Sequence, residues 1–327
     1  MTSRAVLFLQ LGGPETLDDV PGFLYRLFSD PDVIRVRPAL LRNAIAAAIA
    51  LGRKKTSRAL YASIGGGSPI RRLTEEQAAA TEALLSENGR TAGVRAAMTC
   101  SAPFVEDVVR DLAASGVDRF LALPLYPQYS LTTTKGALER TRAAVRRFAP
   151  RARLAELGSF PVHPLFVEAH AEGIREELTR FPDPRPEAVE LVFSAHSIPK
   201  KLVTREGDPY AKQVEASMAA ILARLRWTGP STLAYQSKLG PVEWLGPSTS
   251  EVLGRLGRRG ARQVLVVPIA FVTDHVETLQ EIDQLFADQA REAGIAHFRR
   301  TPGLNSRPTF VRALADLVAS AEAFWAP

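Results

Sequence analysis

Cysteine is nearly absent from this sequence, since Cys100 is the only one among 327 residues. One cysteine excludes a disulfide framework within the chain, and also an iron–sulfur cluster held by the chain's own thiolates. Long apolar runs are missing as well, because no stretch reaches the roughly 18 uninterrupted apolar residues of a membrane span. The short apolar run near the N-terminus predicts a first strand and not a signal peptide. We therefore expect a soluble protein of a reducing, cytoplasmic compartment.

Dense stretches of one charge are also lacking. The net charge of +6, from 41 Lys and Arg against 35 Asp and Glu, suits an acidic ligand, an anionic membrane surface or nucleic acid. The basic residues are scattered, however, and no Lys/Arg stripe interleaved with aromatic residues occurs. We therefore expect no nucleic-acid partner.

Short apolar segments that end abruptly in loops recur along the chain. They are rich in Val, Leu, Ile and Phe without clean alternation, which indicates strands buried on both faces of a parallel sheet. Helical patterns separate them, so the sequence predicts a doubly wound α/β fold. The predicted strands are Ala5–Leu11, Phe120–Tyr126, Glu190–Ala195 and Gln263–Phe271. The predicted helices are Thr74–Glu87, Pro103–Ser115, Thr134–Phe148, His163–Arg180, Ala211–Arg226 and Ser248–Arg258.

A weak internal repeat indicates two related halves. Phe120-Leu-Ala-Leu-Pro-Leu resembles Val264-Leu-Val-Val-Pro-Ile, at an offset of 144 residues (264 − 120). The segment Val6–Pro14 aligns loosely with Leu191–Pro199, which sets Leu11 against His196. We predict one lobe over residues 1–160 and a second over 161–307, with the last helical pattern, residues 308–327, packing back on the first lobe.

His196 follows one of the apolar strands, at the kind of position where ligands bind in parallel α/β sheets. Apolar surroundings lower the pKa of an imidazole and favour its neutral form, which can accept a proton or bind a metal. Taken alone, however, His196 is explained more simply as a hydrogen-bonded structural histidine.

Two carboxylates follow another strongly apolar strand. Glu277 and Glu281 lie four residues apart, so a helix would place both on one face, where they could pass a divalent cation along. An acidic first helical turn with Asp274 as its cap explains the same residues without any function. The spacing alone leaves both interpretations open.

Other familiar site motifs are incomplete. Gly65-Gly-Gly-Ser-Pro lacks the Lys-Ser/Thr that completes a phosphate loop, and Leu11-Gly-Gly-Pro lacks the third glycine of a dinucleotide fingerprint. No Gly-x-Ser-x-Gly elbow occurs either. A nucleotide-binding protein and a serine hydrolase are therefore disfavoured.

Eight segments, in order over nearly the whole chain, together resemble one family, the ferrochelatases. They are Leu11–Thr16, Ile64–Ile70, Tyr126–Ser130, Ser194–Pro199, Gly207–Tyr210, Tyr235–Pro241, Trp244–Pro247 and Phe271–Leu279. Each is weak alone, but eight in register are highly specific. They outweigh the structural explanations of His196 and Glu277.

The resemblance implies two Rossmann-like lobes, each a parallel sheet flanked by helices as in chelatases, with a porphyrin cleft between them. It implies a lyase that inserts Fe²⁺ into a porphyrin, with His196 as the active-site histidine and Glu277 as its acidic partner. Together with Glu281, these two residues form the expected metal route. The positions expected to bind porphyrin are Leu11, Tyr126, Trp244, Phe271, Lys238 and Arg95, with Arg35 and Arg37 as further candidates for its carboxylates. Asp274 and His275 are expected to lie next to the catalytic pair and to hold it in position.

Departures from the family pattern refine these expectations. Leu131 stands where animal-type members carry a cluster cysteine, so no iron–sulfur cluster is expected, and Fe²⁺ is a substrate that needs no redox cofactor. Leu285 stands where many relatives have a third carboxylate, and Ala62 and Ser63 replace two arginines. Leu11-Gly-Gly-Pro favours protoporphyrin IX over coproporphyrin III, whose enzymes often begin with Tyr-Gly-Thr-Pro. A cobalt or nickel chelatase and a non-catalytic porphyrin carrier are the alternatives.

The segment Pro38–Leu51 is nearly all Ala, Ile and Leu, with Arg42 inside it and Arg53-Lys-Lys after it. In the family this region forms a lip that can rest on a membrane, and an apolar helix flanked by basic residues suits that role. A core helix explains the same pattern. We expect a monomer, with peripheral contact at the inner face of the membrane if the first interpretation holds.

Overall fold

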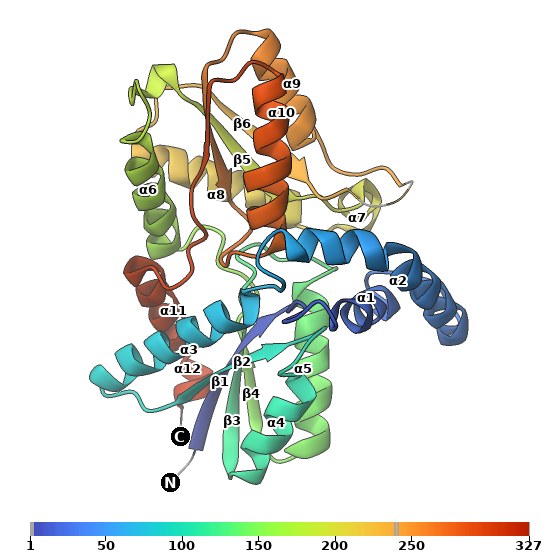
Figure 1. Ribbon diagram of the computed structural model, residues 1–327. Coiled ribbons are helices and arrows are strands. Elements are labelled where there is room, and N and C mark those ends of the chain that lie inside the picture. Colours follow the sequence, from blue (N-terminus) through green and yellow to red (C-terminus); the bar gives the residue numbers. More distant parts are fainter. Residues whose placement is uncertain (1–2, 239, 241, 327) are drawn as a thin grey trace. The chain divides into compact units, whose positions relative to one another are not determined.

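The computed structural model describes residues 3–238, 240 and 242–326, which form two compact α/β units. One unit runs to Ser159 and also includes the residues from Val311 onwards, and the other runs from Phe160 to Phe310. Figure 1 shows a sheet with flanking helices in each unit.

The N-terminal unit is built on a four-stranded parallel sheet in the order β2-β1-β3-β4. Its two central strands are buried because helices cover both faces: α4 and α5 pack on one face, and α3 packs against β1 and β2. The strands are β1 (Ser3–Gln10), β2 (Gly93–Met98), β3 (Val117–Pro124) and β4 (Arg153–Glu156). The helices are α1 (Val20–Ser29), α2 (Ala39–Ala62), α3 (Ile70–Glu87), α4 (Val105–Ala114), α5 (Thr134–Phe148) and α12 (Glu322–Trp325), together with most of α11 (Pro308–Ser320).

The C-terminal unit repeats this plan with the order β6-β5-β7-β8. Side chains of α9, η2 and α10 form the core on one face of the sheet, and α6 packs against β7. The strands are β5 (Glu190–His196), β6 (Ser231–Gln236), β7 (Gln263–Pro268) and β8 (His297–Arg300). The helices are α6 (Pro164–Leu178), η1 (Pro186–Ala188), α7 (Lys200–Glu206), α8 (Tyr210–Leu225), α9 (Thr249–Arg258), η2 (Glu277–Phe286) and α10 (Ala287–Glu292).

The two sheets also share a register. Ala5 pairs with Phe120 in the first sheet, and Glu190 pairs with Val264 in the second, so β1 corresponds to β5 at an offset of 185 (190 − 5). This offset carries Leu11, just after β1, onto His196, the last residue of β5. The register therefore supports the internal repeat found in the sequence.

The predicted α/β fold is confirmed, but the element boundaries need correction. The predicted strands Phe120–Tyr126 and Gln263–Phe271 extend too far, because each ladder ends at a proline, Pro124 or Pro268. Proline has no N–H to donate to a sheet, although Leu125 or Ile269, directly after each proline, still donates to the neighbouring central strand, at 2.9 and 3.1 Å. The helix predicted from Thr74 begins four residues earlier, at Ile70.

Candidate active site

His196 and Glu277 form a hydrogen-bonded pair at the carboxyl end of the C-terminal sheet. His196 is the last residue of β5, and Glu277 is the first residue of η2. His196 Nδ1 lies 2.8 Å from Glu277 Oε2, and the Tyr210 hydroxyl donates to the His196 carbonyl at 2.9 Å. The side chains of His196 and Glu277 are 39% and 26% exposed, so a ligand can reach them.

The pair favours charge on both partners. Burial lowers the pKa of His196, but the charge of Glu277 and its hydrogen bond outweigh burial and leave that pKa raised above 6.5. Burial raises the pKa of Glu277, but the His196 and His275 rings hold it well below 4.5. When a neutral His196 donates Nδ1–H to Glu277, its Nε2 carries the free lone pair. His196 is therefore a stronger base than an isolated histidine, with Nε2 as the atom that can take a proton or bind a metal.

Glu281 continues the acidic row and is held by three donors. The Ser237 N–H donates to Oε1 at 2.9 Å, and the Ser237 hydroxyl and Gln236 Nε2 donate to Oε2. Gln236 Nε2 also donates to the Glu277 carbonyl at 3.0 Å. Burial, followed by the charge of Glu277, raises the pKa of Glu281 above its ordinary value. Glu281 therefore takes up a proton more readily than Glu277.

The helix that carries both carboxylates is a π-helix. Its i→i+5 hydrogen bonds widen the turn beyond the 3.6 residues of an α-helix, so residues four apart lie nearly one above the other. Glu277 and Glu281 are therefore stacked along one side of η2, as their spacing predicted. Leu285, four residues further on, is 42% exposed and interrupts the acidic row.

Two further predicted residues, Phe271 and His275, lie beside the pair. The Phe271 ring is 6.5 Å from the His196 ring and 4.8 Å from the His275 ring, measured between centroids. His275 Nε2 is 3.9 Å from Glu277 Oε2, and its Nδ1 lies 2.9 Å from the Thr273 carbonyl. The structure therefore brings together His196, Glu277, Phe271 and His275, which come from two segments far apart in sequence.

Asp274 lies behind this cluster in a dense set of contacts. Its carboxylate accepts from Arg300 Nη1 at 2.8 Å, Asn305 Nδ2 at 2.8 Å and the Thr278 hydroxyl at 2.9 Å. Burial raises the pKa of Asp274, but Arg300 and these hydrogen bonds outweigh it and leave the pKa lowered. Asp274 therefore supports the turn before η2, and its oxygens are engaged there.

The loop after β6 carries the remaining predicted residues of this unit. Lys238 is exposed, and Trp244 is half-buried in a bridge to Pro199. Leu239 and Pro241, which belong to the motif Tyr235–Pro241, lie outside the described residues.

Five predicted residues belong to the N-terminal unit. Leu11 and Tyr126 follow the carboxyl ends of β1 and β3, and both are half-buried. Arg95 lies instead near the amino end of β2, where its Nη1 pairs with Glu82 at 2.7 Å. Arg35 is exposed, as is Arg37. Arg95 is therefore not at the carboxyl edge of the sheet, where Leu11 and Tyr126 lie.

Three residues at the site were not singled out from the sequence. Gln236, Ser237 and Tyr210 contact the predicted residues through hydrogen bonds. All three lie inside motifs that carried the family resemblance, and this was the available signal. The contacts of Gln236 and Ser237 depend on the pairing of β5 with β6, and that of Tyr210 on the position of α8 beside β5, neither of which the sequence revealed.

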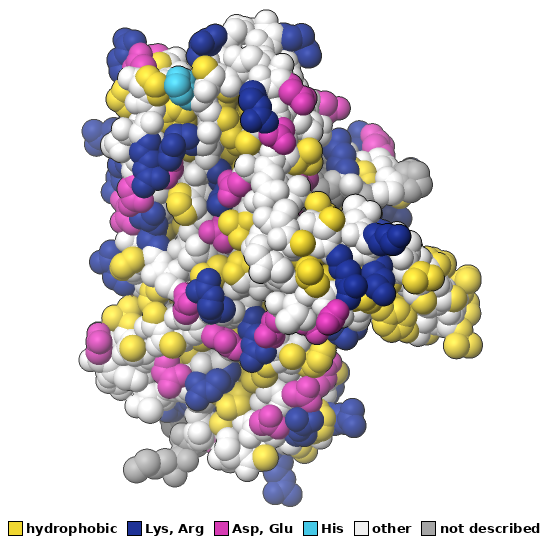
Figure 2. Space-filling view, in the orientation of Figure 1, with side chains coloured by type: hydrophobic (Ala, Val, Ile, Leu, Met, Phe, Trp, Pro, Cys, Tyr) yellow, Lys and Arg dark blue, Asp and Glu magenta, His cyan; other side chains and the backbone are white. Residues whose placement is uncertain are grey.

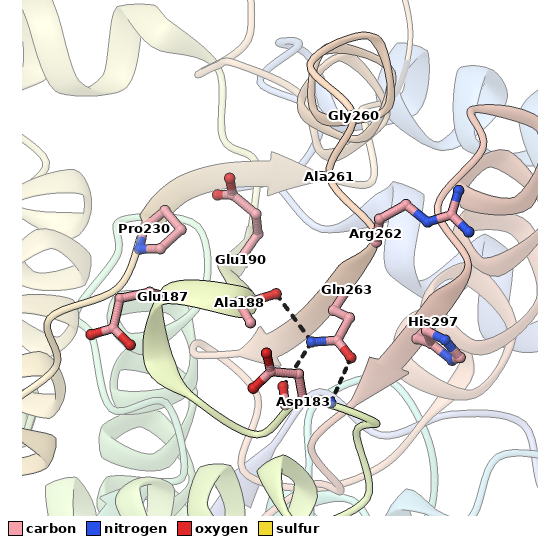
Figure 3. Close-up of a pocket in the computed structure, with 10 residues that line it drawn as sticks. All are labelled: Asp183, Glu187, Ala188, Glu190, Pro230, Gly260, Ala261, Arg262, Gln263 and His297. Atoms are coloured by element: carbon pink, nitrogen blue, oxygen red, sulfur yellow. Dashed lines mark hydrogen bonds between the residues drawn. The ribbon is translucent and has the colours of Figure 1, made fainter.

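A pocket of about 470 Å³ lies at the opposite, amino-terminal edge of the same sheet (Figure 3). Gln263 closes one side of it by donating to the carbonyls of Asp183 and Ala188 at 2.7 and 3.1 Å. Asp183 pairs with Arg185, and Glu187 accepts from the Thr228 hydroxyl. These carboxylates are engaged locally and are far along the strands from His196, so the pocket is separate from the candidate site.

Within the described part of the chain, no group of three or more His, Cys, Asp and Glu side chains is arranged to hold a metal ion. The donors that iron could meet at the site are the His196 ring and the carboxylates of Glu277 and Glu281.

The fold is that of known chelatases. SirB from Bacillus subtilis with Fe³⁺ aligns with a TM-score of 0.57 over 98% of this chain and 96% of that one, at 13% sequence identity. CbiX, described as the terminal enzyme for biosynthesis of siroheme in denitrifying bacteria, aligns with a TM-score of 0.53 over 77% and 92%, at 18% identity. Identities this low establish the fold alone, and the class is therefore an α/β protein of chelatase-like fold.

Sequence similarity then identifies the family. The family model for ferrochelatase matches residues 3–322. The ferrochelatase of Synechococcus sp. (strain JA-2-3B'a(2-13)) is 46% identical over 97% of this chain and 92% of that protein. The ferrochelatase of Nostoc sp. (strain PCC 7120 / SAG 25.82 / UTEX 2576) is 44% identical over 97% and 81%. The chain belongs to the ferrochelatase family, the metal chelatases that insert ferrous iron into a porphyrin in haem biosynthesis. The predicted family, enzyme class and chelatase-like fold are thereby confirmed.

Proposed function

We propose that this protein inserts Fe²⁺ into protoporphyrin IX to form protohaem, the last step of haem biosynthesis. The observation that carries the proposal is the His196–Glu277 pair, 2.8 Å apart at the carboxyl end of a parallel sheet, with Glu281 one turn further on. The motif Leu11-Gly-Gly-Pro supports protoporphyrin IX over coproporphyrin III as the porphyrin.

In this proposal the residues of the site move protons and guide iron. A free-base porphyrin must bend and lose two pyrrole protons before the metal can enter. His196 Nε2 accepts a pyrrole proton, and Glu277 stabilises the imidazolium that results. Glu281, whose pKa is raised, takes up a proton most readily along the row. The same two carboxylates attract Fe²⁺, which is a substrate here and requires no redox cofactor or iron–sulfur cluster.

We further propose that the porphyrin binds between a lobe of residues 1–160 and a lobe of residues 161–307. Leu11 and His196 occupy equivalent positions in the two repeats. This supports the proposal that they face the porphyrin ring from its two opposite sides. Apolar and aromatic contacts would hold the ring bent, so that binding energy favours the transition state. The residues proposed to contact it are Leu11, Tyr126, Trp244, Phe271 and Lys238.

We also propose a peripheral membrane contact through α2, for a monomer in the cytoplasm. Leu40, Leu41 and Leu51 are 83%, 50% and 76% exposed, so the core-helix interpretation of this segment is wrong for these side chains. Figure 2 shows hydrophobic side chains gathered over α2, with Lys and Arg beside them. An apolar helix flanked by cations suits the surface of an anionic bilayer. Among the helices in the described residues, none has the length and hydropathy needed to cross a membrane.

Anaerobic metal insertion tests the function. Purified protein is mixed with Fe²⁺ or Zn²⁺ and, separately, with protoporphyrin IX and coproporphyrin III, and the loss of free-base fluorescence is followed. We expect turnover with a preference for protoporphyrin IX. We also expect His196→Ala to abolish insertion while porphyrin still binds, and His297→Ala, an exposed histidine at the opposite edge of the sheet, to retain it. Binding without turnover in every combination would indicate a porphyrin carrier.

A further inference from the structure

Arg300 is a buried cation that joins two separate carboxylates behind the candidate site. It is the last residue of β8, and its side chain is only 8% exposed. Its Nε and Nη2 each donate to one oxygen of Asp283 at 2.8 Å, which makes a two-pronged contact. Its Nη1 donates to Asp274 Oδ1 at 2.8 Å and to the Thr301 carbonyl at 3.0 Å. The guanidinium therefore has partners on three sides.

The two carboxylates lie in the helix that begins with Glu277, the acidic partner of His196, and in the turn before that helix. Asp283 lies within η2, the π-helix that begins at Glu277. Asp274 lies in the turn before that helix and accepts from the hydroxyl of Thr278, which in turn accepts from the His275 N–H at 3.0 Å. Arg300 therefore ties the middle of η2 to the turn that carries His275.

The geometry points to Arg300 as a positioning residue for the Glu277–His196 pair, an inference that rests on the proposed function. Two-pronged Arg–carboxylate contacts fix orientation as well as supplying energy, because both donors lie in one rigid plane. Such a contact on η2 fixes the rotation of the helix about its axis, and with it the direction in which the Glu277 carboxylate points. Arg300 touches neither His196 nor Glu277, so it acts through the helix.

Loss of Arg300 would also leave the carboxylates of Asp274 and Asp283 without their positively charged partner. Asp274, whose side chain is only 13% exposed, would lose its cation, and removing one partner of a buried pair leaves the other uncompensated. Asp283, which is 38% exposed, would lose the contact that fixes its direction. The turn and the helix would then relax to separate or hydrate these carboxylates. Either movement changes the 2.8 Å contact between Glu277 and His196.

The neighbouring residue provides a matched control. Arg299 is also in β8, and its Nε donates to Glu177, a carboxylate on α6 whose side chain is 4% exposed, at 2.7 Å. Replacing Arg299 with glutamine therefore breaks an Arg–carboxylate pair of the same strand, but on the side of α6 and not of η2. A purely structural role for Arg300 would make the two variants behave alike.

The test compares Arg300→Gln, Arg300→Lys and Arg299→Gln in anaerobic Zn²⁺ insertion. The concentration of folded enzyme is measured by titrating its porphyrin-binding sites, and kcat is calculated per folded molecule. We expect Arg300→Gln to lower kcat by about 10- to 100-fold, since misplacement by about 1 Å can cost that much, with the porphyrin KM within about twofold of wild type. Arg300→Lys, which keeps the charge and loses the fork, should fall in between. Arg299→Gln should keep the wild-type kcat even if both glutamine variants melt earlier.

A double variant tests whether the effect passes through Glu277. Adding Arg300→Gln to Glu277→Gln should lower kcat by less than about twofold more, because residues that act as one unit are not additive. The inference is overturned by a wild-type kcat for Arg300→Gln, by equal losses in Arg299→Gln, or by a multiplicative double variant. If Arg300→Gln does not fold, Arg300→Lys and Asp283→Asn carry the same comparison. A wild-type protein that inserts no metal would instead refute the proposed function.

Discussion

Replacing Glu277 with glutamine removes the charge on the acidic partner of His196 while keeping the size of its side chain. A hydrogen bond to a charged group is worth about 1.5–3 kcal/mol. The two side chains are 39% and 26% exposed, so solvent screening weakens the interaction, and we take about 1–2 kcal/mol. At about 1.4 kcal/mol per factor of ten in rate, Glu277→Gln should lower kcat by roughly 5- to 30-fold through His196 alone.

The assay is anaerobic insertion of Zn²⁺ or Fe²⁺ into protoporphyrin IX, with Glu187→Gln as the control. Glu187 lies at the opposite edge of the same sheet and accepts a hydrogen bond from Thr228, so its loss should leave kcat unchanged. A loss well beyond 30-fold for Glu277→Gln would give Glu277 a second role as a carboxylate for iron. A rate near wild type would refute the reasoning and remove Glu277 from the mechanism.

The same substitution has a defined pH signature in stability. The pKa of His196 is raised above 6.5, so its stabilisation is present below about pH 6.5 and is lost as the pH rises through the folded-state pKa. The pKa of Glu277 is lowered below 4.5, so its stabilisation is present above about pH 4.5 and is lost as the pH falls through the folded-state pKa. Both terms act together between these values. The melting temperatures of wild type and Glu277→Gln should therefore differ more at pH 5.5 than at pH 9, and an equal difference at both would contradict the assignment.

Two further predictions concern other parts of the molecule. His170 is buried against Phe166, and burial lowers its pKa to about 3, so its folded form stays neutral while the unfolded form charges below about pH 6.5. His170→Leu should therefore stabilise the protein at pH 4.5, by about 2 kcal/mol in chemical denaturation, relative to its effect at pH 8; no difference between the two would refute this. On α2, Leu40→Glu combined with Leu51→Glu should abolish binding to anionic vesicles in a sedimentation assay, because both leucines are largely exposed. Leu285→Glu, another exposed leucine, should bind like wild type, and equal loss in both would argue against α2 as the contact.

Composition predicted the central strands well and the edge strands poorly. β1, β5 and β7 are buried along most of their length, and continuous apolar runs encode that burial. The edge strands β4 and β8, Arg-Leu-Ala-Glu and His-Phe-Arg-Arg, are four residues long and partly exposed, so no apolar run marks them. Each pairs with the strand that precedes it in the chain, β3 or β7, across intervening helices, and only the folded sheet selects that pairing.

The candidate site, too, could be predicted from the sequence only in part. His196 and Glu277 were predicted because each follows an apolar strand and belongs to a family motif, and Glu281 because it lies four residues beyond Glu277. The three donors that hold Glu281 come from Gln236 and Ser237, which β6 brings beside β5. Spacing along the chain carries no information about such contacts.

The sequence by itself determined the α/β class, the repeat that relates Leu11 to His196, and the family to which the chain belongs. These follow from local apolar patterns and from motifs in order, which need no contact between distant residues. The tertiary structure decided that η2 is a π-helix that stacks Glu277 over Glu281, and that Arg300 at the end of β8 holds that helix. It also decided that the leucines of α2 face outwards. Burial and pairing between residues far apart in sequence are properties of the folded chain, because every partner must be present before a contact or a solvent-facing side exists.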